Sequence, residues 1–262
     1  MKEVEANKKA WGLLAQDHYL HFKNKLVSKD FVLNPIIQKE LGDISGKKIL
    51  HLQCNTGADS IFLARLGASV TGVDLAPENI HFARKLAEDF GMTNVDFIQS
   101  DVLKLMDNHS GQYDIVFTSD GAIGWLPDLK LWAKTVRHFL KPDGFFYVHD
   151  SHPLFLIYDE EAMDSGSLQI RYPYFKDHVE VEDQIGGYAS DPKEATIYYW
   201  AFKLSDLINA LASAGLFIQH MAEHDRCAYG MGGIKQDSSG LWYYPEFEGA
   251  LPITLSLRAV IR

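Results

Sequence analysis

Short apolar runs of strand type alternate with amphipathic helical stretches through the first 150 residues of the chain. The strand-like runs cover residues 49–52, 69–73, 95–99, 113–119 and 145–149, and apolar positions at helical spacing fill residues 58–66, 77–90 and 127–140. Pro127 opens the last of these helices, and residues 141–144 form a turn before the last of these strands. Such alternation predicts βαβ units, with right-handed crossovers, and therefore a mainly parallel sheet.

The two ends of the chain depart from this alternation. Residues 1–40 have a helical pattern that breaks at Asn34-Pro35, before a short helix over 36–41. Residues 151–196 and 225–250 have no sustained pattern. Outside these two stretches we expect a strand at 196–202, a helix that Ser205 caps and Gly215 ends, and strands at 216–223 and 252–261. The last two strands have no crossover helix between them, so they are antiparallel neighbours or well separated.

No repeat or linker divides the sequence, which predicts a single domain over residues 1–262 with N-terminal helices at 1–45. The irregular stretches 151–196 and 225–250 are interpreted as inserts that form a cap over that domain. A structureless loop as long as the first insert is usually functional or contains an element that the pattern does not reveal.

Residues 47–79 form a strand–loop–helix–strand unit whose loop ends at Gly57 and whose second strand ends at Asp74. This unit places loop amides at a helix N-terminus, with a carboxylate one strand away. A ribose-bearing ligand suits both features, because Asp74 can accept hydrogen bonds from its hydroxyls. The unit alone does not specify which such ligand binds.

The composition narrows the class of protein. The 262 residues are 47% hydrophobic and 23% charged, which is typical of an ordinary globular protein, and the net charge of −10 argues against an extended nucleic-acid surface. Cys54 and Cys227 form no disulfide framework, and neither they nor His224 stand at a metal-binding spacing. No apolar run reaches membrane-spanning length, and residues 1–11 contain no signal core. We therefore expect a cytoplasmic protein, monomeric or homodimeric, with no membrane, nucleic-acid or metal partner.

Five motifs in order resemble those of the class I S-adenosylmethionine-dependent methyltransferases. The loop HLQCNTG at 51–57 aligns with the D/E-x-G-x-G-x-G loop of that family and resembles a bacterial subgroup with an H-L-Q-C loop. The others are GVDLA at 72–76, Asp101-Val102, YDIV at 113–116 and LKPDGF at 140–145. The resemblance implies an α/β, Rossmann-like, doubly wound sheet of seven mainly parallel strands with an antiparallel C-terminal strand, N-terminal helices and an inserted cap. It also implies that residues 46–150 bind S-adenosylmethionine.

The first motif departs from the family pattern. His51 stands where an acid is usual, and Gln53 and Asn55 replace two glycines, so that only Gly57 remains. Asparagine tolerates a left-handed backbone better than other non-glycine residues, so we expect Asn55 to preserve the turn.

The resemblance implies roles for residues that match the motifs. Asp74 would bind the ribose hydroxyls, Asp101 the adenine amino group, and Val102 the adenine ring. Gln53 would reach the amino-acid end, and Ser119 and Asp120 would line the sulfonium. The cofactor-binding candidates are Gln53, Asn55, Gly57, Asp74, Leu75, Asp101, Val102, Ser119 and Asp120. Each of the acids, and Ser119, could instead be an ordinary turn residue.

Candidate catalytic groups follow the fifth strand. A methyl acceptor needs a base only if it is a hydroxyl or a protonated amine, and His149 or His152 could serve, with Asp150 between them. His149 is favoured because it ends a strand. Both histidines could instead be packed structural residues.

The acceptor pocket is predicted from aromatic residues: Trp11, His18, Tyr19, Tyr174, Tyr199 and Trp200. With few Lys or Arg nearby, they favour a small organic acceptor, unless they only form the core of the cap. Two alternatives to a methyltransferase remain open. One is an NAD(P)-dependent oxidoreductase, and the other is a methyltransferase-like protein that binds the cofactor weakly without being an efficient enzyme.

Overall fold

The computed structural model describes residues 1–28, 34–176, 178–228 and 233–262. Positions 29–33 of the predicted helical N-terminal region, 177 of the first insert and 229–232 of the second lie outside the described residues.

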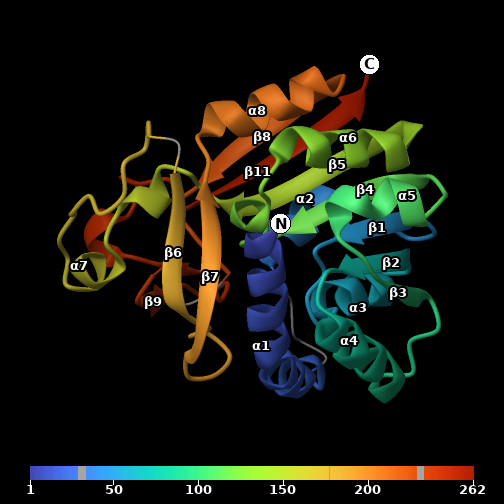
Figure 1. Ribbon diagram of the computed structural model, residues 1–262, viewed down its shortest axis with the longest axis horizontal. Helices are drawn as coiled ribbons and strands as arrows, with labels where there is room; N and C mark the ends of the chain where they lie inside the picture. Colours follow the sequence, from blue (N-terminus) through green and yellow to red (C-terminus); the bar gives the residue numbers. More distant parts are fainter. Residues whose placement is uncertain (29–33, 177, 229–232) are drawn as a thin grey trace.

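Seven strands form the central sheet, in the spatial order β3-β2-β1-β4-β5-β11-β8 (Figure 1). All run parallel except β11, which lies antiparallel between β5 and β8. The predicted sheet is thereby confirmed, including the antiparallel pairing at the C-terminal end. The strands are β1 (Lys48–Leu52), β2 (Ser69–Asp74), β3 (Val95–Gln99), β4 (Tyr113–Ser119), β5 (Leu140–Ser151), β8 (Leu216–His224) and β11 (Thr254–Ile261).

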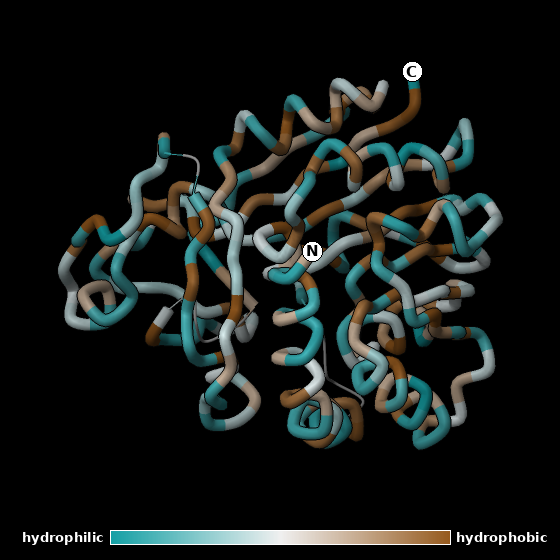
Figure 2. The backbone as a smooth tube through the Cα atoms, viewed as in Figure 1, coloured by the Kyte–Doolittle hydropathy of each residue, from teal (hydrophilic) through white to brown (hydrophobic). Residues whose placement is uncertain are grey.

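Helices cover both faces of the sheet, because alternate residues of each buried strand point to opposite sides. Ile49 of β1 belongs to a core formed with α1–α4, whereas the next residue, Leu50, belongs to a core formed with α6 and α8. The helices are α1 (Lys2–Leu26), α2 (Pro35–Leu41), α3 (Ala58–Arg65), α4 (Pro77–Asp89), α5 (Leu105–Asn108), α6 (Leu129–Phe139) and α8 (Leu204–Ser213). Figure 2 shows hydrophobic residues along the central strands and hydrophilic ones on the outer turns of α4. None of the helices in the described part of the chain is long and apolar enough to cross a membrane.

Three predicted boundaries are wrong. Residues 141–144 do not form a separate turn but a bulge inside β5, where Tyr113 pairs with Leu140 and Ile115 with Phe145. Helix α6 begins at Leu129 rather than Pro127, because the Asp128 carboxylate accepts a hydrogen bond from the amide of Leu131 at 2.9 Å.

Ser205 does not cap α8, the third error. The helix begins one residue earlier, at Leu204, and the Asp206 carboxylate accepts from the amide of Lys203 at 3.0 Å. A carboxylate in the first turn thus satisfies a backbone donor before the helix, in the manner of a capping box.

The first insert contains an element that the sequence did not reveal. β6 (His178–Ile185) pairs antiparallel with β7 (Lys193–Ala201), and this hairpin stands beside the central sheet, with α1 next to β7 (Figure 1). β6 escaped prediction because it is short of apolar residues and most of its side chains are exposed, including those of Val179 and Val181. Asn7 of α1 fixes the hairpin by donating to the carbonyl of Tyr198 at 2.7 Å and accepting from its amide at 2.8 Å.

Shorter elements complete the inserts and the connections between strands. They are η1 (Val102–Lys104), η2 (Ile123–Trp125), η3 (Phe155–Ile157), α7 (Glu160–Asp164), β9 (Lys235–Gln236), β10 (Trp242–Tyr243) and η5 (Pro245–Phe247). The sheet order reverses between β1 and β4, and ligands bind beyond the strand ends at such a switch point.

Candidate functional site

The loop after β1 is built on left-handed residues. Gln53, Asn55 and Gly57 have φ values of 58°, 51° and 78°. The prediction that Asn55 keeps the turn is confirmed. Its side-chain oxygen accepts from the amide of Thr56 at 2.7 Å and lies 3.2 Å from Nδ1 of His18. The loop therefore keeps a glycine-like path with side chains at two of the positions that carry glycine in the family motif.

Gly57 is required for packing as well as for its backbone conformation. A Cβ atom at this position would lie 2.7 Å from the ring of Phe97 and 3.0 Å from Ala83. Gly57 does not itself line the cavity described below. Its place is between α3 and the sheet, where it allows the helix to approach β3.

Asp74, at the end of β2, is a buried acceptor with partners already in place. Its Oδ1 accepts from the amide of Ala76 at 2.9 Å and from Nδ2 of Asn79 at 3.0 Å, while Oδ2 accepts from the amide of Asn55 at 2.9 Å. Burial raises the pKa of Asp74 above its usual value, although these hydrogen bonds oppose the shift. A carboxylate has about four lone-pair sites, so Oδ2 retains capacity for one ligand hydroxyl.

Asp101 and Val102 follow β3 and line the same cavity. Oδ1 of Asp101 accepts from the amide of Leu103 at 2.9 Å, as expected of a turn residue. This bond uses one of the two carboxylate oxygens. The capping role and the predicted role toward a ligand are therefore compatible.

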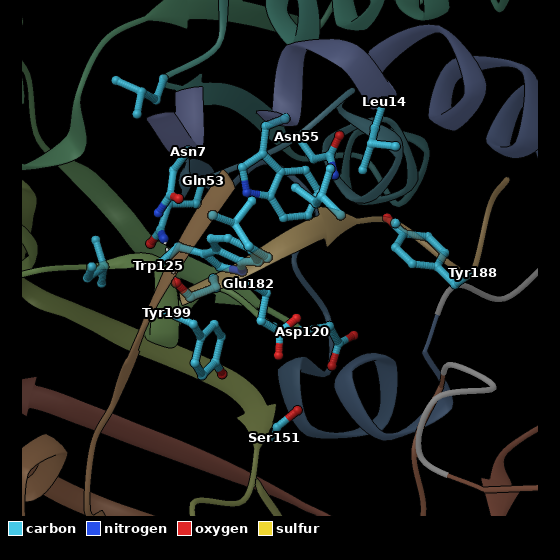
Figure 3. A pocket seen from close by; sticks show the side chains of 18 of the residues that line it. Asn7, Leu14, Gln53, Asn55, Asp120, Trp125, Ser151, Glu182, Tyr188 and Tyr199 are labelled. Atoms are coloured by element: carbon cyan, nitrogen blue, oxygen red, sulfur yellow. Dashed lines mark hydrogen bonds between the residues drawn. The ribbon is translucent and has the colours of Figure 1, made fainter. Parts of the chain in front are cut away.

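A cavity of about 1080 Å³ connects these strand ends with the β6–β7 hairpin. This volume is slightly above the usual range for small-molecule sites, about 300–1,000 Å³. Its walls include all the cofactor-binding candidates except Gly57: Gln53, Asn55, Asp74, Leu75, Asp101, Val102, Ser119 and Asp120. Figure 3 shows Asp120, Trp125, Tyr199 and Glu182 around the same hollow.

Ser119 lies in a buried polar cluster at the floor of the cavity. Its hydroxyl donates to Oδ2 of Asp59 and lies 3.5 Å from Nε2 of His51, and Nδ1 of His51 lies 2.8 Å from the hydroxyl of Ser60. Burial lowers the pKa of His51 to about 3 and raises that of Asp59 to about 7. His51 is therefore neutral at physiological pH, and Asp59 is the ionisable acid of the cluster.

The two candidate catalytic histidines are both buried, and neither lines the cavity. Nδ1 of His149 lies 2.5 Å from Oδ1 of Asp120, which does line it. Burial disfavours the charged imidazole, but the carboxylates of Asp120, Asp150 and Glu40 prevail and raise the pKa of His149. His152 instead faces β8, where its Nε2 lies 2.9 Å from Glu223, and burial lowers its pKa. The side chain of His149 thus contacts a cavity-lining side chain, that of Asp120, whereas the side chain of His152 is paired with Glu223 on β8.

Asp150, between these histidines, has a backbone-organising role. Its carboxylate accepts from the amides of Gly121, Ala122 and Ile123, each at 2.9 Å, and from that of Ser151 at 2.6 Å. It thereby fixes the loop after β4 that carries Asp120 and leads into η2.

Of the six aromatic acceptor candidates, Trp11 and Tyr199 line the cavity and the other four do not. His18 contacts Asn55 from behind, Tyr19 donates to Asp89 at 2.6 Å, and the hydroxyl of Tyr174 accepts from the amide of Leu204 at 3.1 Å. Trp200 neighbours Tyr199 along β7, so its side chain points to the opposite face of the hairpin.

The residues of the cavity wall that sequence reasoning missed include Asp59, Trp125, Glu182 and Tyr188. The ring of Trp125 packs edge-on against Trp11 at 5.0 Å and against Tyr199 at 5.5 Å between ring centroids. Asp59 carried a signal that could have been used, because it is an acid on a helix whose residues 58–64 are otherwise apolar apart from Ser60.

Comparison with known proteins places the chain in a family. A family model described as "Methyltransferase domain" matches residues 43–186, more than half of the chain. The chain belongs to this methyltransferase family. Its seven-stranded sheet is the fold of solved S-adenosylmethionine-dependent methyltransferases. The nicotinamide alternative receives no support from this assignment.

Individual relatives agree with the assignment. The methyltransferase is 32% identical to a "Ubiquinone biosynthesis O-methyltransferase" of Actinobacillus pleuropneumoniae over 124 residues, which are 44% of this chain and 52% of that protein. An Escherichia coli protein of the same name is 33% identical over 116 residues, 43% of this chain and 48% of its own. The chain thus spans about half the length of these curated relatives.

Solved structures share the fold of this methyltransferase. A S-adenosylmethionine-dependent methyltransferase from Clostridium acetobutylicum aligns with a TM-score of 0.61 at 17% identity, covering 94% of this chain and 98% of that one. One from Mesorhizobium loti aligns with a TM-score of 0.57 at 19% identity, covering 86% and 95%.

The cavity of the methyltransferase has a donor and acceptor set that fits S-adenosylmethionine. Asp74 and Asp101 would accept hydrogen bonds from its ribose and its adenine, respectively. Two buried oxygens in the loop, Oε1 of Gln53 and Oγ1 of Thr56, have no hydrogen-bond partner among the described residues. Buried polar atoms are rarely left unpaired in native proteins, so we expect a polar ligand to form hydrogen bonds with this loop.

Proposed function

We propose that the chain transfers the methyl group of S-adenosylmethionine to a small organic acceptor held between the sheet and the β6–β7 hairpin. The observation that carries this proposal is the continuity of one cavity from Asp74 and Asp101 to Tyr199. A single space therefore serves both a nucleoside and a second ligand. Residues 46–150 would bind the cofactor, and the inserts 151–196 and 225–250 would form the acceptor side.

Bound S-adenosylmethionine supplies a methyl group on a positively charged sulfur, which is a good leaving group. The protein then contributes mainly alignment, which can lower a barrier by as much as about 7–11 kcal/mol when the geometry is near-attack. Asp74, Asp101 and the loop of Gln53 and Asn55 would orient the cofactor. Ser119 and Asp120, at the end of β4, would border the reacting centre.

The acceptor side of the cavity combines aromatic rings with carboxylates. Trp11, Trp125 and Tyr199 form a connected set of rings, and Glu182 of β6 joins this wall. The hydroxyl of Tyr172 donates to Oε1 of Glu182 at 3.3 Å. Flat or partly apolar acceptors that carry hydrogen-bond donors fit this combination. The two curated relatives are named as O-methyltransferases of ubiquinone biosynthesis, which is compatible with a hydroxyl acceptor.

Where the acceptor has a proton to lose, Asp120 is the group that would receive it. Asp120 lines the cavity, and His149 supports it from the buried side through the 2.5 Å contact. His149 would then act as a positioning residue that stabilises the Asp120 carboxylate. His152, which faces β8, would have no part in this step.

Titration with S-adenosylhomocysteine by calorimetry tests the cofactor part of the proposal. We expect the wild-type protein to bind it, and Asp74→Ala to weaken binding at least about tenfold, because three donors and a ribose hydroxyl lose their acceptor. Asp143→Asn, which removes an exposed acid in the β5 bulge, is the matched control and should leave affinity unchanged.

Unchanged affinity in Asp74→Ala would remove Asp74 from the site. Absence of heat for wild type with S-adenosylhomocysteine would instead favour the weakly binding, non-catalytic alternative, and heat with NAD would revive the oxidoreductase one. A screen of phenol, amine and thiol acceptors for S-adenosylhomocysteine formation then tests the acceptor class.

A further inference from the structure

Asp59 is a buried acid without a cationic partner. It is 9% exposed, lines the cavity from the first turn of α3, and accepts from the hydroxyl of Ser119. Among the described residues, no Lys, Arg or His forms an ion pair with it, whereas Asp120 nearby pairs with His149. Carboxylates are rarely buried unless they are paired, so we expect the Asp59 carboxylate to form an ion pair with a cationic group of a ligand in the cavity.

The end of β1 offers no charge that could do the same. His51 stands where the family motif has an acid, and its imidazole is held neutral by burial between Ser60 and Ser119. Ser119 links the two positions, because its hydroxyl contacts both His51 and Asp59. The only carboxylate of this buried cluster is therefore supplied by the helix rather than by the strand.

The N-terminus of α3, next to the Asp59 carboxylate, carries a partial positive charge. Gly57 caps the helix without a side chain, so no side chain of the cap accepts from the first amides, which form the positive end of the helix. Thr56, which precedes the cap, is fully buried and lines the cavity, and its hydroxyl has no hydrogen-bond partner among the described residues. An anion at this helix end would thus meet backbone amides and one free hydroxyl.

A carboxylate acceptor beside an anion site is complementary to a zwitterionic α-amino acid group. We propose that Asp59, with Thr56 and the first amides of α3, holds the amino-acid end of S-adenosylmethionine. The carboxylate of Asp59 accepts from the ligand ammonium, and Thr56 and the amides bind the ligand carboxylate. This inference rests on the proposed function, and it gives the cofactor pocket an acid that replaces the one missing at position 51.

Binding of an ammonium should also displace a proton. Burial raises the pKa of Asp59 to about 7 in the ligand-free protein, and a bound cation favours the ionised form. Affinity for a ligand with an ammonium should then increase as the pH rises through this pKa. The titratable or charged groups facing Asp59 are Asp120 and His149 from the ends of β4 and β5, His51 of β1, Cys54 of the loop, and Tyr188 after β6.

The test compares two probes by calorimetry: S-adenosylhomocysteine, and methylthioadenosine, which keeps the adenine, ribose and sulfur but lacks the amino-acid end. Asp59→Asn keeps an acceptor for Ser119 and removes the charge. We expect it to weaken S-adenosylhomocysteine binding about 10- to 100-fold, as for loss of a charged hydrogen bond, and methylthioadenosine binding by less than about threefold. Asp143→Asn should change neither value.

A second measurement uses only the wild-type protein, in case Asp59→Asn does not fold. At about pH 7, titration in two buffers of different ionisation enthalpy should reveal proton release with S-adenosylhomocysteine and none with methylthioadenosine. The inference would be overturned if Asp59→Asn weakened the binding of both probes equally or left the binding of both unchanged. It would also be overturned if the wild-type protein released the same number of protons with both probes. If wild type binds both probes, such a result leaves the proposed function standing. If wild type binds neither, the proposed function fails first.

Discussion

At the scale of single residues, three non-glycine residues of the described chain adopt a left-handed backbone conformation that favours glycine: Gln53, Asn55 and Asp120. All three line the cavity. A left-handed conformation at a non-glycine residue costs roughly 1–2 kcal/mol, least for Asn and Asp, and such strain concentrates at functional sites. Each is held by a hydrogen bond to a distant part of the chain. Gln53 donates to the carbonyl of Ala122 at 2.7 Å, the amide of Asn55 donates to Asp74 at 2.9 Å, and the amide of Asp120 donates to the carbonyl of His149 at 2.7 Å.

A pair of substitutions isolates the free-energy cost of the left-handed backbone conformation at position 55. Asn55→Gly and Asn55→Ala both remove the side-chain contacts to Thr56 and His18, but only alanine resists a φ of 51°. We expect Asn55→Ala to be less stable than Asn55→Gly by about 1 kcal/mol in urea unfolding, with weaker S-adenosylhomocysteine binding. Equal stability of the two variants would mean that the loop relaxes out of the left-handed conformation.

At the scale of elements, the acceptor side depends on how η2 meets the hairpin. Asp150 holds residues 121–123, and η2 then brings Gly124 against the ring of Tyr199 on β7. A Cβ at Gly124 would overlap that ring. The loop after β1 is linked to this region by the hydrogen bond from Gln53 to the carbonyl of Ala122. Gly124 and Tyr199 lie outside that loop, so we expect substitutions there to act first on the acceptor side of the cavity.

Gly124→Ala should displace Tyr199 and widen the gap between η2 and the hairpin. We expect a loss of stability of about 1–3 kcal/mol, typical of overpacking, and a raised KM for the acceptor, with S-adenosylhomocysteine affinity within about twofold of wild type. The double variant Gly124→Ala/Tyr199→Ala removes the obstructing ring and should recover part of the stability. If the double variant is no more stable than Gly124→Ala, the overlap with Tyr199 is not the cause.

At the scale of the whole molecule, the buried acids oppose stability in the ligand-free state. The chain has a net charge of −10, and burial raises the pKa of Asp59, Asp74 and Asp150. A group whose pKa is higher in the folded than in the unfolded protein keeps its proton longer when folded. Its contribution to stability is therefore complete at low pH and is lost as the pH rises through the folded-state pKa.

Asp59→Asn tests this linkage. The pKa of Asp59 rises from 3.8 to about 7 on folding, so wild type should lose stability between about pH 4 and pH 7 in part through this residue. Because asparagine does not ionise, the variant should be more stable than wild type by about 1–3 kcal/mol at about pH 8, and nearly equal to it near pH 4. Urea unfolding of both proteins across this range measures the difference. A parallel pH dependence would show that Asp59 is compensated in the wild-type protein.

The amino-acid sequence by itself determined the mainly parallel central sheet and the left-handed turn at Asn55 in the loop after β1. The largely apolar run at residues 113–119 coincides with β4, because burial on both faces of a central strand imposes a pattern that can be recognised locally. The motif residues Asp74 and Asp101 were found for a similar reason, since their place at strand ends follows from the sequence alone. Asn55 was assigned a left-handed turn from its own conformational preference.

Only the tertiary structure decided which side chains share the cavity. Asp59 meets Ser119 across 60 residues of chain, and Phe97 fills the space that Gly57 leaves open. β6 is defined by its pairing with β7, because most of its own side chains, including Val179 and Val181, are exposed. Trp11 and Tyr199 border the ligand space while Tyr19 and Tyr174 do not, because orientation depends on partners distant in sequence. The local pattern of apolar and polar residues determines where a strand ends, whereas long-range packing determines which side chains lie opposite that strand end.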